Sequence, residues 1–300
     1  MTAFMLAGVL HEAANARHAT FDAVPVDPVA MARDGATAEA VSRYERHGFA
    51  IFRLSGSQWN EDTVLGLARS VGLGEPFVPP LYTRAGRAAP SVSRITAPPV
   101  ASPNGVAHPG FETRDGQDLH CDGTLQEIGE VKSAILLCGA QGLSGGTTTL
   151  FNAHGAFAAL LARDPEAAQA LTAPGVLVRQ ATINESTEFV ESPVFTVQDG
   201  LLVCRYCVDT TDRWVLPDGA AAQDVKRGLD FLDNARRIGS PYILRFALDE
   251  GQALLLDNTR VSHGRDPYED DEHHRRLLYR SLHLRHPSVA SANREAVRGR

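Results

Sequence analysis

The amino-acid sequence predicts an α+β fold in which many strands form a barrel or a two-sheet jelly roll, with flanking helices and a helical insert. Three observations predict this class. Strand signals recur through most of the chain, helical periodicity appears in separate blocks, and the two do not alternate as a doubly wound parallel sheet requires. The 300 residues suit a single domain, 1–300, because large barrels and sandwiches reach this size.

The first predicted elements are helices that precede a long irregular segment. Residues 36–54 predict a helix that ends at Gly48 and continues as a short apolar strand. Residues 60–72 predict a second helix from the helical spacing of their apolar side chains. Residues 79–119 are then rich in Pro, Ala, Gly and Ser. Because regular signals resume directly afterwards, this segment predicts an active-site lid rather than a linker between domains.

The second half of the chain predicts a helical insert and a hairpin between strands, over residues 152–240. Asn152 and Asp164 are typical helix starts, and Asp199-Gly200 between two apolar runs predicts a hairpin turn. An amphipathic helix then precedes the final strands. The remaining strand signals lie at 118–123, 132–141, 242–266 and 275–285.

Composition excludes several classes of function. The apolar fraction of 43% and the charged fraction of 22% are those of an ordinary globular protein. The net charge of -7 and the lack of a basic stripe argue against a nucleic-acid partner. No apolar run reaches the roughly 18 residues of a transmembrane helix. Four cysteines make no disulfide framework, and Cys204 and Cys207 are expected to be buried apolar residues. We therefore expect a cytoplasmic protein that acts on a small molecule, while the oligomeric state stays open.

The candidate chemistry begins at His120 and Asp122. On a strand, these residues project from the same face while Cys121 faces the other way, so the imidazole and the carboxylate converge. His263 follows an apolar strand 141 positions after Asp122. Two histidines and one carboxylate form the ligand set of non-heme Fe(II) oxygenases, which keep positions open for a co-substrate and O2. The absence of a thiolate favours iron over structural zinc.

Two arginines near the end of the chain predict an anionic partner beside the metal. Arg276 and Arg280 share one face of a predicted strand, on the opposite side from Arg275. Two inward guanidinium groups are costly to bury without a counter-charge. Each matches a carboxylate in a bidentate manner, so a dicarboxylate co-substrate would satisfy both.

These motifs together resemble a known family. HxD at 120–122, SGGTTT at 144–149, DNTRVSHGR at 257–265 and RRLLYR at 275–280 occur in the order typical of the taurine dioxygenase (TauD/TfdA) family. The resemblance extends from YERHGFAIFRL, at 44–54, to the last strand. It implies a double-stranded β-helix and an Fe(II)- and 2-oxoglutarate-dependent dioxygenase, which couples decarboxylation of 2-oxoglutarate to hydroxylation of a substrate C–H bond.

The resemblance also implies roles for individual residues. His120, Asp122 and His263 would be the iron ligands. Thr148 and Arg276 would bind the distal carboxylate of 2-oxoglutarate, and Arg280 would lie near the carboxylate that chelates iron. The spacing from His263 to Arg276 is slightly longer than in the family pattern, so a bulge could exchange Arg276 for Arg275. Because related halogenases have a small residue in place of Asp122, halogenation is not expected.

Substrate contacts are predicted from position and from a narrower resemblance. Asp118 lies two residues before His120, so strand geometry directs it toward the same cavity. Residues 205–214 resemble the substrate-facing loop of amino-acid hydroxylases in the clavaminate synthase-like branch. The sequence thus predicts a small polar substrate, an amino acid or its derivative, in specialised biosynthesis. Further candidate contacts are Arg205, Asp209 and Asp212; these charges could equally be solvated.

Other classes of function remain open at this point. A hydrolase or isomerase on a cupin-like barrel could hold zinc or manganese with the same three ligands, but it would not need Thr148, Arg276 and Arg280 together. A catalytically inactive ligand-binding relative would show a damaged triad or anion clamp. Within the oxygenase class, desaturation, cyclisation or stereoinversion could replace hydroxylation, because only the pose of the substrate differs.

Overall fold

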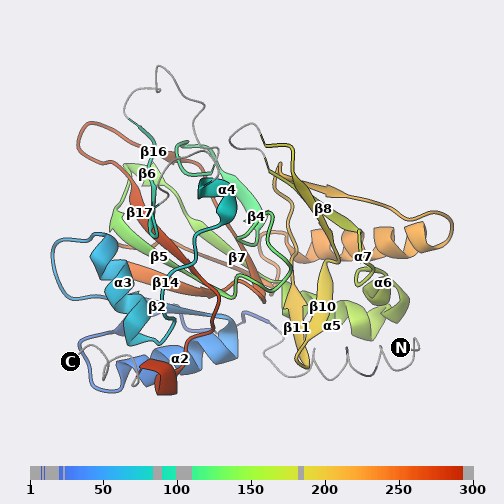
Figure 1. Ribbon diagram of the computed structural model, residues 1–300, viewed down its shortest axis with the longest axis horizontal. Helices are drawn as coiled ribbons and strands as arrows, with labels where there is room; N and C mark the ends of the chain where they lie inside the picture. Colours follow the sequence, from blue (N-terminus) through green and yellow to red (C-terminus); the bar gives the residue numbers. More distant parts are fainter. Residues whose placement is uncertain are drawn as a thin grey trace.

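Two main β-sheets, three smaller sheets and flanking helices make up the described part of the molecule (Figure 1). The computed structural model describes Gly8, Leu10 and residues 20–22, 24–83, 90–98, 110–181 and 186–292. The predicted lid thus lies partly outside the described residues, at 84–89 and 99–109. Among the described residues, no helix combines the length and hydrophobicity needed to cross a membrane.

The larger sheet has six strands, and the smaller main sheet has four. The six-stranded sheet runs in the order β1 (Val29–Ala30), β2 (Phe49–Arg53), β14 (Gln252–Asp257), β5 (Ser133–Ala140), β17 (Leu277–His283) and β3 (Ser93–Ile95). The four-stranded sheet runs in the order β13 (Ile243–Phe246), β7 (Thr148–Asn152), β15 (Val261–Arg265) and β4 (Gln117–His120). All pairings in both sheets are antiparallel except that of β1 with β2.

An apolar core joins the two main sheets. Ile51, Leu254 and Leu256 of the larger sheet belong to the same buried cluster as Leu150 and Val261 of the smaller one. Burial on both sides explains why these strands read as continuous apolar runs in the sequence. The short extra strands β6 (Ser144–Gly145) and β16 (Tyr268–Glu269) pair with each other.

Two helices pack on the six-stranded sheet. α2 (Ala36–His47) and α3 (Glu61–Ser70) bury Tyr44 and Leu67 in a cluster with side chains of β2, β5 and β14. Gly48 ends α2 with a φ of 82°, and its amide donates to the Tyr44 carbonyl at 2.8 Å. The helix and the strand predicted within 36–54 are therefore confirmed, and so is the helix predicted at 60–72.

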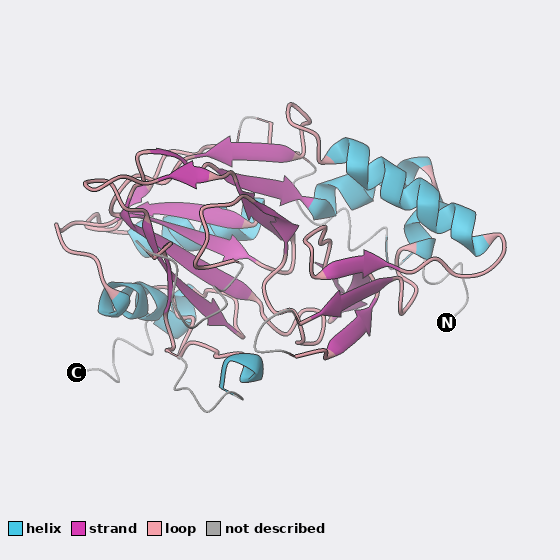
Figure 2. Ribbon diagram, turned by 90° about the horizontal axis from the view of Figure 1, so that it is seen from above, coloured by secondary structure: helices cyan, strands magenta, loops and turns pink. Residues whose placement is uncertain are grey.

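The insert over 152–240 lies to one side of the main sheets in both views (Figures 1 and 2). Its buried apolar cluster also includes Leu119 of β4 and Phe151 of β7, and the hairpin turns at Asp199 and Gly200 as predicted. It also holds a three-stranded sheet, which the sequence analysis did not predict because its strands have only three or four residues. Its elements are α5 (Ala153–Arg163), α6 (Pro165–Ala170), β8 (Leu177–Gln180), β9 (Phe189–Ser192), β10 (Phe195–Gln198), β11 (Leu201–Cys204), β12 (Asp212–Trp214) and α7 (Ala221–Ala235).

Two irregularities in the sheets affect the site. Between His263 and Arg265 of β15, the partner positions on β4 move from His120 to Gln117, so β4 carries one extra residue there. On β5, the pairing with β17 skips Gly139, which makes a second bulge. Bulges re-aim side chains and are common near active sites. The bulge on β4 lies beside the predicted ligands His120 and His263, and the bulge on β5 lies opposite the start of β17, the strand that carries Arg280.

Candidate metal centre and substrate cavity

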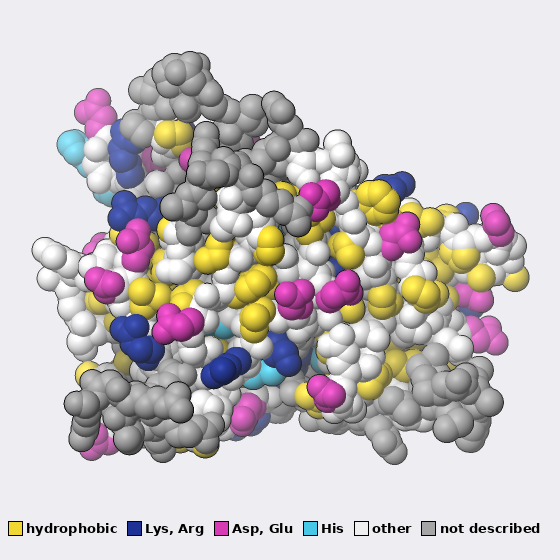
Figure 3. Space-filling view, in the orientation of Figure 1, with side chains coloured by type: hydrophobic (Ala, Val, Ile, Leu, Met, Phe, Trp, Pro, Cys, Tyr) yellow, Lys and Arg dark blue, Asp and Glu magenta, His cyan; other side chains and the backbone are white. Residues whose placement is uncertain are grey.

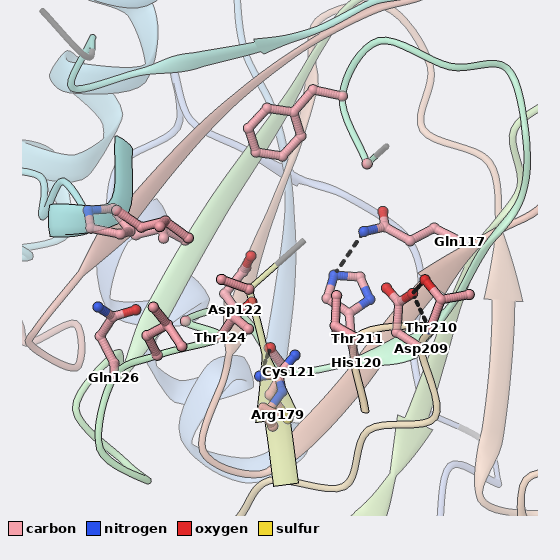
Figure 4. Close-up of a pocket in the computed structure, with 18 of the residues that line it drawn as sticks. Gln117, His120, Cys121, Asp122, Thr124, Gln126, Arg179, Asp209, Thr210 and Thr211 are labelled. Atoms are coloured by element: carbon pink, nitrogen blue, oxygen red, sulfur yellow. Dashed lines mark hydrogen bonds between the residues drawn. The ribbon is translucent and has the colours of Figure 1, made fainter. Parts of the chain in front are cut away.

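The three predicted metal ligands converge on one point. His120 is the last residue of β4, His263 lies in β15, and the two are direct partners across these neighbouring strands. Their rings are 4.3 Å apart between centroids. Asp122 follows two residues after His120, and one potential ligand atom of each residue lies within 4.8 Å of the others. All three side chains are buried, and Figure 4 shows His120 and Asp122 on the cavity wall.

The protonation states fit metal binding. Nδ1 of His120 lies 2.9 Å from the carbonyl of Asp118, so an Nδ1–H donor leaves the lone pair on Nε2, which here faces the amide nitrogen of Gln117 at 3.3 Å and could bind a metal in its place. Burial and then the neighbouring His120 lower the pKa of His263 to about 3, which keeps this imidazole neutral. Although burial opposes it, Arg280 and the two histidines lower the pKa of Asp122, which keeps the carboxylate ionised.

The donor set fits Fe(II). Oδ2 of Asp122 is buried and has no hydrogen-bond partner among the described residues, and it lies 3.7 Å from Nε2 of His263. Cys121 faces the other way, as predicted: its amide donates to Cys207 Sγ at 3.2 Å, and its thiol lies 3.7 Å from Ser262 Oγ. Two imidazoles and one carboxylate, without thiolate, are the facial set of non-heme iron. Among the described residues, this is the only such cluster.

Arg280 lies directly beside the candidate metal centre. It is buried in β17, and its Nη1 forms an ion pair with Oδ1 of Asp122. Its guanidinium carbon lies 4.5 Å from the centroid of the Phe111 ring. An anion bound to the metal would therefore meet a fixed positive charge, which is the place that the family resemblance implies for Arg280.

Arg276 and Thr148 line a second, smaller cavity of about 190 Å³. Nη1 of Arg276 is buried without a hydrogen-bond partner among the described residues, and its guanidinium carbon lies 4.9 Å from the Tyr268 ring centroid. Burial and the nearby Arg265 lower the pKa of Arg276 to about 10, although Asp270 acts in the opposite direction, and the guanidinium stays charged at neutral pH. This cavity can bind a carboxylate.

Local geometry explains why Arg276, and not Arg275, faces inward. Arg276 precedes β17 and is buried, whereas Arg275 is exposed. The extra residue of the bulge is Gly139 on the partner strand, so the faces of β17 are not exchanged. Gly146 makes room for the arginine: with a φ of 70°, any Cβ there would lie 2.9 Å from Arg276 Nε.

The larger cavity, of about 290 Å³, opens beside the metal ligands. Its wall includes His120, Asp122 and Arg280, together with the predicted substrate contacts Asp118 and Asp209. Both cavities lie against the same face of β17: Leu278 lines the smaller cavity, and Arg280 and Leu282 line the larger one. The described part of the predicted lid lines this cavity through Pro79, Leu81, Tyr82, Gly110, Phe111 and residues 115–118.

The other two predicted substrate contacts do not line the cavity. Asp212 is buried in an ion pair with Arg179 Nε at 2.6 Å, and Arg205 is buried with its Nη2 bonded to the Gln126 carbonyl. Arg179, which the sequence analysis missed, does line the cavity. No local sequence pattern predicts that Arg179 lines the cavity. It lies in the short strand LVRQ, and its position depends on the pairing of β8 with β12.

Comparison with known proteins identifies the family. Residues 14–282 match the model of the family described as "Taurine catabolism dioxygenase TauD, TfdA family". The chain belongs to this family. The resemblance read from the motifs is therefore confirmed, as are the enzyme class and the cofactors: this TauD/TfdA protein is a 2-oxoglutarate-dependent dioxygenase that uses Fe(II).

Individual relatives and solved structures are also similar to this chain. A uridine-5'-phosphate dioxygenase of Amycolatopsis sp is 39% identical over 269 residues, which cover 89% of this chain and 95% of the relative. Another uridine-5'-phosphate dioxygenase, of Streptomyces sp, is 36% identical over 229 residues, or 76% of this chain and 81% of the relative. A taurine dioxygenase structure from Burkholderia xenovorans shares the fold at a TM-score of 0.56, with 19% identity over 83% of this chain and 81% of that one.

Proposed function

We propose that the enzyme oxidises a C–H bond of a uridine-5'-phosphate-like nucleotide. The observation that carries this proposal is the 39% identity with a uridine-5'-phosphate dioxygenase across 95% of that relative. An amino-acid substrate, expected from the 205–214 segment, has less support, because Arg205 and Asp212 are engaged inside the protein. Hydroxylation is the expected outcome, with desaturation, cyclisation or stereoinversion as alternatives from the same oxidant.

Residues of the chain would act in fixed roles. His120, Asp122 and His263 would hold Fe(II), which, when bound with 2-oxoglutarate, supplies the oxidation of the substrate by O2. Arg276 and Thr148 would bind the distal carboxylate in the smaller cavity, and Arg280 would face the metal-binding end of the co-substrate. The Asp118 carbonyl would fix the tautomer of His120 through Nδ1.

The wall of the larger cavity would position the nucleotide. The carboxylates of Asp118 and Asp209 can accept hydrogen bonds from ribose hydroxyl groups, which are donors that a carboxylate suits. Pro79, Leu81, Tyr82 and Phe111, from the described part of the 79–119 segment, would exclude water from the reacting carbon. We also infer that the two main sheets form a double-stranded β-helix, and that residues 1–300 fold as one domain with the insert.

The test is stepwise and begins without substrate. Adding Fe(II) and then 2-oxoglutarate to the metal-free protein without O2 should give the weak visible charge-transfer band of a chelated keto acid, whereas succinate should give none. Uridine-5'-phosphate should then stimulate succinate release in air more than uridine, cytidine-5'-phosphate or free amino acids do. Equal release with every compound would contradict a nucleotide substrate, and iron binding without the band would contradict the roles proposed for Arg276, Thr148 and Arg280.

A further inference from the structure

Two buried arginines interact beside the larger cavity: Arg179, which lines it, and Arg205; of the two, only Arg179 forms an ion pair among the described residues, with Asp212. Arg179 of β8 is 2% exposed and Arg205 is 3% exposed. Arg179 uses Nε for Asp212 and Nη1 for the carbonyl of Cys121 at 2.8 Å. Arg205 has no carboxylate partner: Nη2 donates to the Gln126 carbonyl, and Nη1 has no hydrogen-bond partner among the described residues.

The charges in this cluster do not balance. The buried Cys207 thiol beside the two arginines adds no negative charge, and the nearby carboxylate of Asp122 is paired with Arg280. Burial raises the pKa of the Cys207 thiol, which keeps it neutral. Burial, followed by the positive charge of Arg179, lowers the pKa of Arg205 to about 10, which still leaves it charged at neutral pH. Arg179, Arg205 and Asp212 therefore leave one positive charge in a buried shell, which is costly without an anion.

The cavity wall in front of these arginines holds a hydroxyl group without a partner. Oγ1 of Thr211 is buried and has no hydrogen-bond partner among the described residues, although Thr211 lines the cavity together with Arg179. The neighbouring Thr210 differs, because its Oγ1 lies 3.1 Å from Asp209 Oδ1. Figure 4 shows Thr210 and Asp209 to the right of His120, Thr211 overlapping His120 in this view, and Arg179 below Cys121.

We propose that this wall is an anion subsite in which Thr211 and Arg179 bind the phosphate group of the substrate and Arg205 supplies charge from behind. The proposal rests on the proposed function and adds the residues that would distinguish a nucleotide from its nucleoside. A hydroxyl donor and a guanidinium satisfy phosphate oxygens well. The carboxylates on the same wall suit hydroxyl groups instead: Asp209 already accepts from Thr210 through Oδ1, and Asp118 is exposed.

The decisive variant is Thr211→Val, which removes the hydroxyl group and keeps the shape of the side chain. Calorimetry under anaerobic conditions, on protein with Fe(II) and 2-oxoglutarate, would compare uridine-5'-phosphate with uridine. We expect the Kd for the nucleotide to rise about tenfold or more, as for loss of a hydrogen bond to a charged group, while that for uridine stays unchanged. Thr210→Val is the matched control and should change neither Kd by this amount.

Arg205→Met tests the contribution of the buried charge, because it keeps much of the length of the side chain. It should weaken binding of the nucleotide and leave uridine binding unchanged, provided that the circular dichroism spectrum is that of the wild type. If Thr211→Val leaves the nucleotide Kd unchanged, or raises both Kd values equally, the phosphate binds elsewhere on the wall, for example at Arg280, and the subsite is wrong.

Inorganic phosphate separates failure of this inference from failure of the proposed function. Wild-type protein that binds phosphate, and loses it in Thr211→Val, retains the subsite even if uridine-5'-phosphate does not stimulate succinate release; the proposed substrate would then be wrong. The subsite is wrong if the wild-type protein does not bind phosphate and binds the nucleotide no more tightly than uridine. Turnover of the nucleotide with no effect of Thr211→Val overturns the subsite and leaves the proposed function in place.

Discussion

His120 and His263 face each other because they are partners on hydrogen-bonded strands, and the two-residue spacing brings Asp122 to the same point. The convergence of His120 and Asp122 could be predicted from the period of a strand. The position of His263 opposite His120 could not, because the pairing of β4 with β15 joins distant parts of the chain. From the sequence, His263 could be assigned to the same site as His120 only through the order of the motifs, which resembles that of the family.

Replacing His263 tests the metal centre. His263→Ala should lose Fe(II) binding and therefore the charge-transfer band, because two remaining ligands cannot hold the metal in a facial set. The measurement is the band after anaerobic addition of Fe(II) and 2-oxoglutarate. His274→Ala, in an exposed turn, is the control and should keep the band. A normal band in His263→Ala would assign the third ligand to another residue.

Replacing Arg276 tests the carboxylate cavity. Arg276→Ala should weaken 2-oxoglutarate binding by roughly 2–5 kcal/mol, the cost of losing a buried, charge-assisted partner. Titration of the visible band measures this affinity directly. The adjacent, exposed Arg275→Ala should leave it near the wild-type value. The opposite ranking of the two variants would mean that Arg275 holds the carboxylate instead.

At the scale of elements, the bulge in β4 requires a glycine on the partner strand. A Cβ at Gly264 would lie 2.6 Å from the carbonyl oxygen of Gln117, and a backbone atom cannot move aside as a side chain can. The sequence offers the HGR motif but no sign of this close approach. Strand periodicity likewise could not reveal which strand carries an extra residue, so the bulges at β4 and β5 were beyond prediction.

Gly264→Ala should therefore separate β4 from β15 and distort the metal centre. We expect a loss of about 1–3 kcal/mol in the free energy of unfolding, as for overpacking, together with a weakened charge-transfer band. Chemical denaturation and the band measure the two effects. Gly66→Ala in α3 is the control: nothing lies within 4 Å of its Cβ, so it should stabilise the helix by roughly 0.5–1 kcal/mol. An unperturbed band in Gly264→Ala would show that the strands tolerate the added methyl group.

At the scale of the molecule, the sequence predicted a mixed fold of helices and strands, both flanking helices and the hairpin, because local periodicity and turn residues specify them. The three-stranded sheet of the insert and the cavity-lining role of Arg179 depend on long-range pairing and were not predicted. The whole chain also buries several ionisable groups, and their burial links stability to pH. In the metal-free protein, His263 and His283 have pKa values of about 3 and about 4, below the ordinary 6.5, chiefly because of burial.

The metal-free protein should lose stability in acid. Between the native and the ordinary pKa values of these histidines the unfolded chain binds more protons, so the free energy of unfolding falls as pH falls below about 6.5. The lowered pKa of Asp122 acts in the same direction at lower pH. Urea unfolding at pH 7 and pH 5 measures this. His283→Gln should reduce the slope by up to ~1.4 kcal/mol per pH unit; an unchanged slope would exclude His283 as a contributor.

The strand that carries His120 is also an edge. β4 pairs with β15 on one side, and on the other side its Leu119 carbonyl accepts from the amide of Val208, at the start of the segment that holds Asp209 and Thr211. A metal bound to both His120 and His263 would link β4 to β15 and make local opening of β4 less frequent. The Val208 amide should then exchange its hydrogen for deuterium more slowly after metal loading. Metal loading would thus set the rigidity of the substrate-facing segment before any substrate arrives.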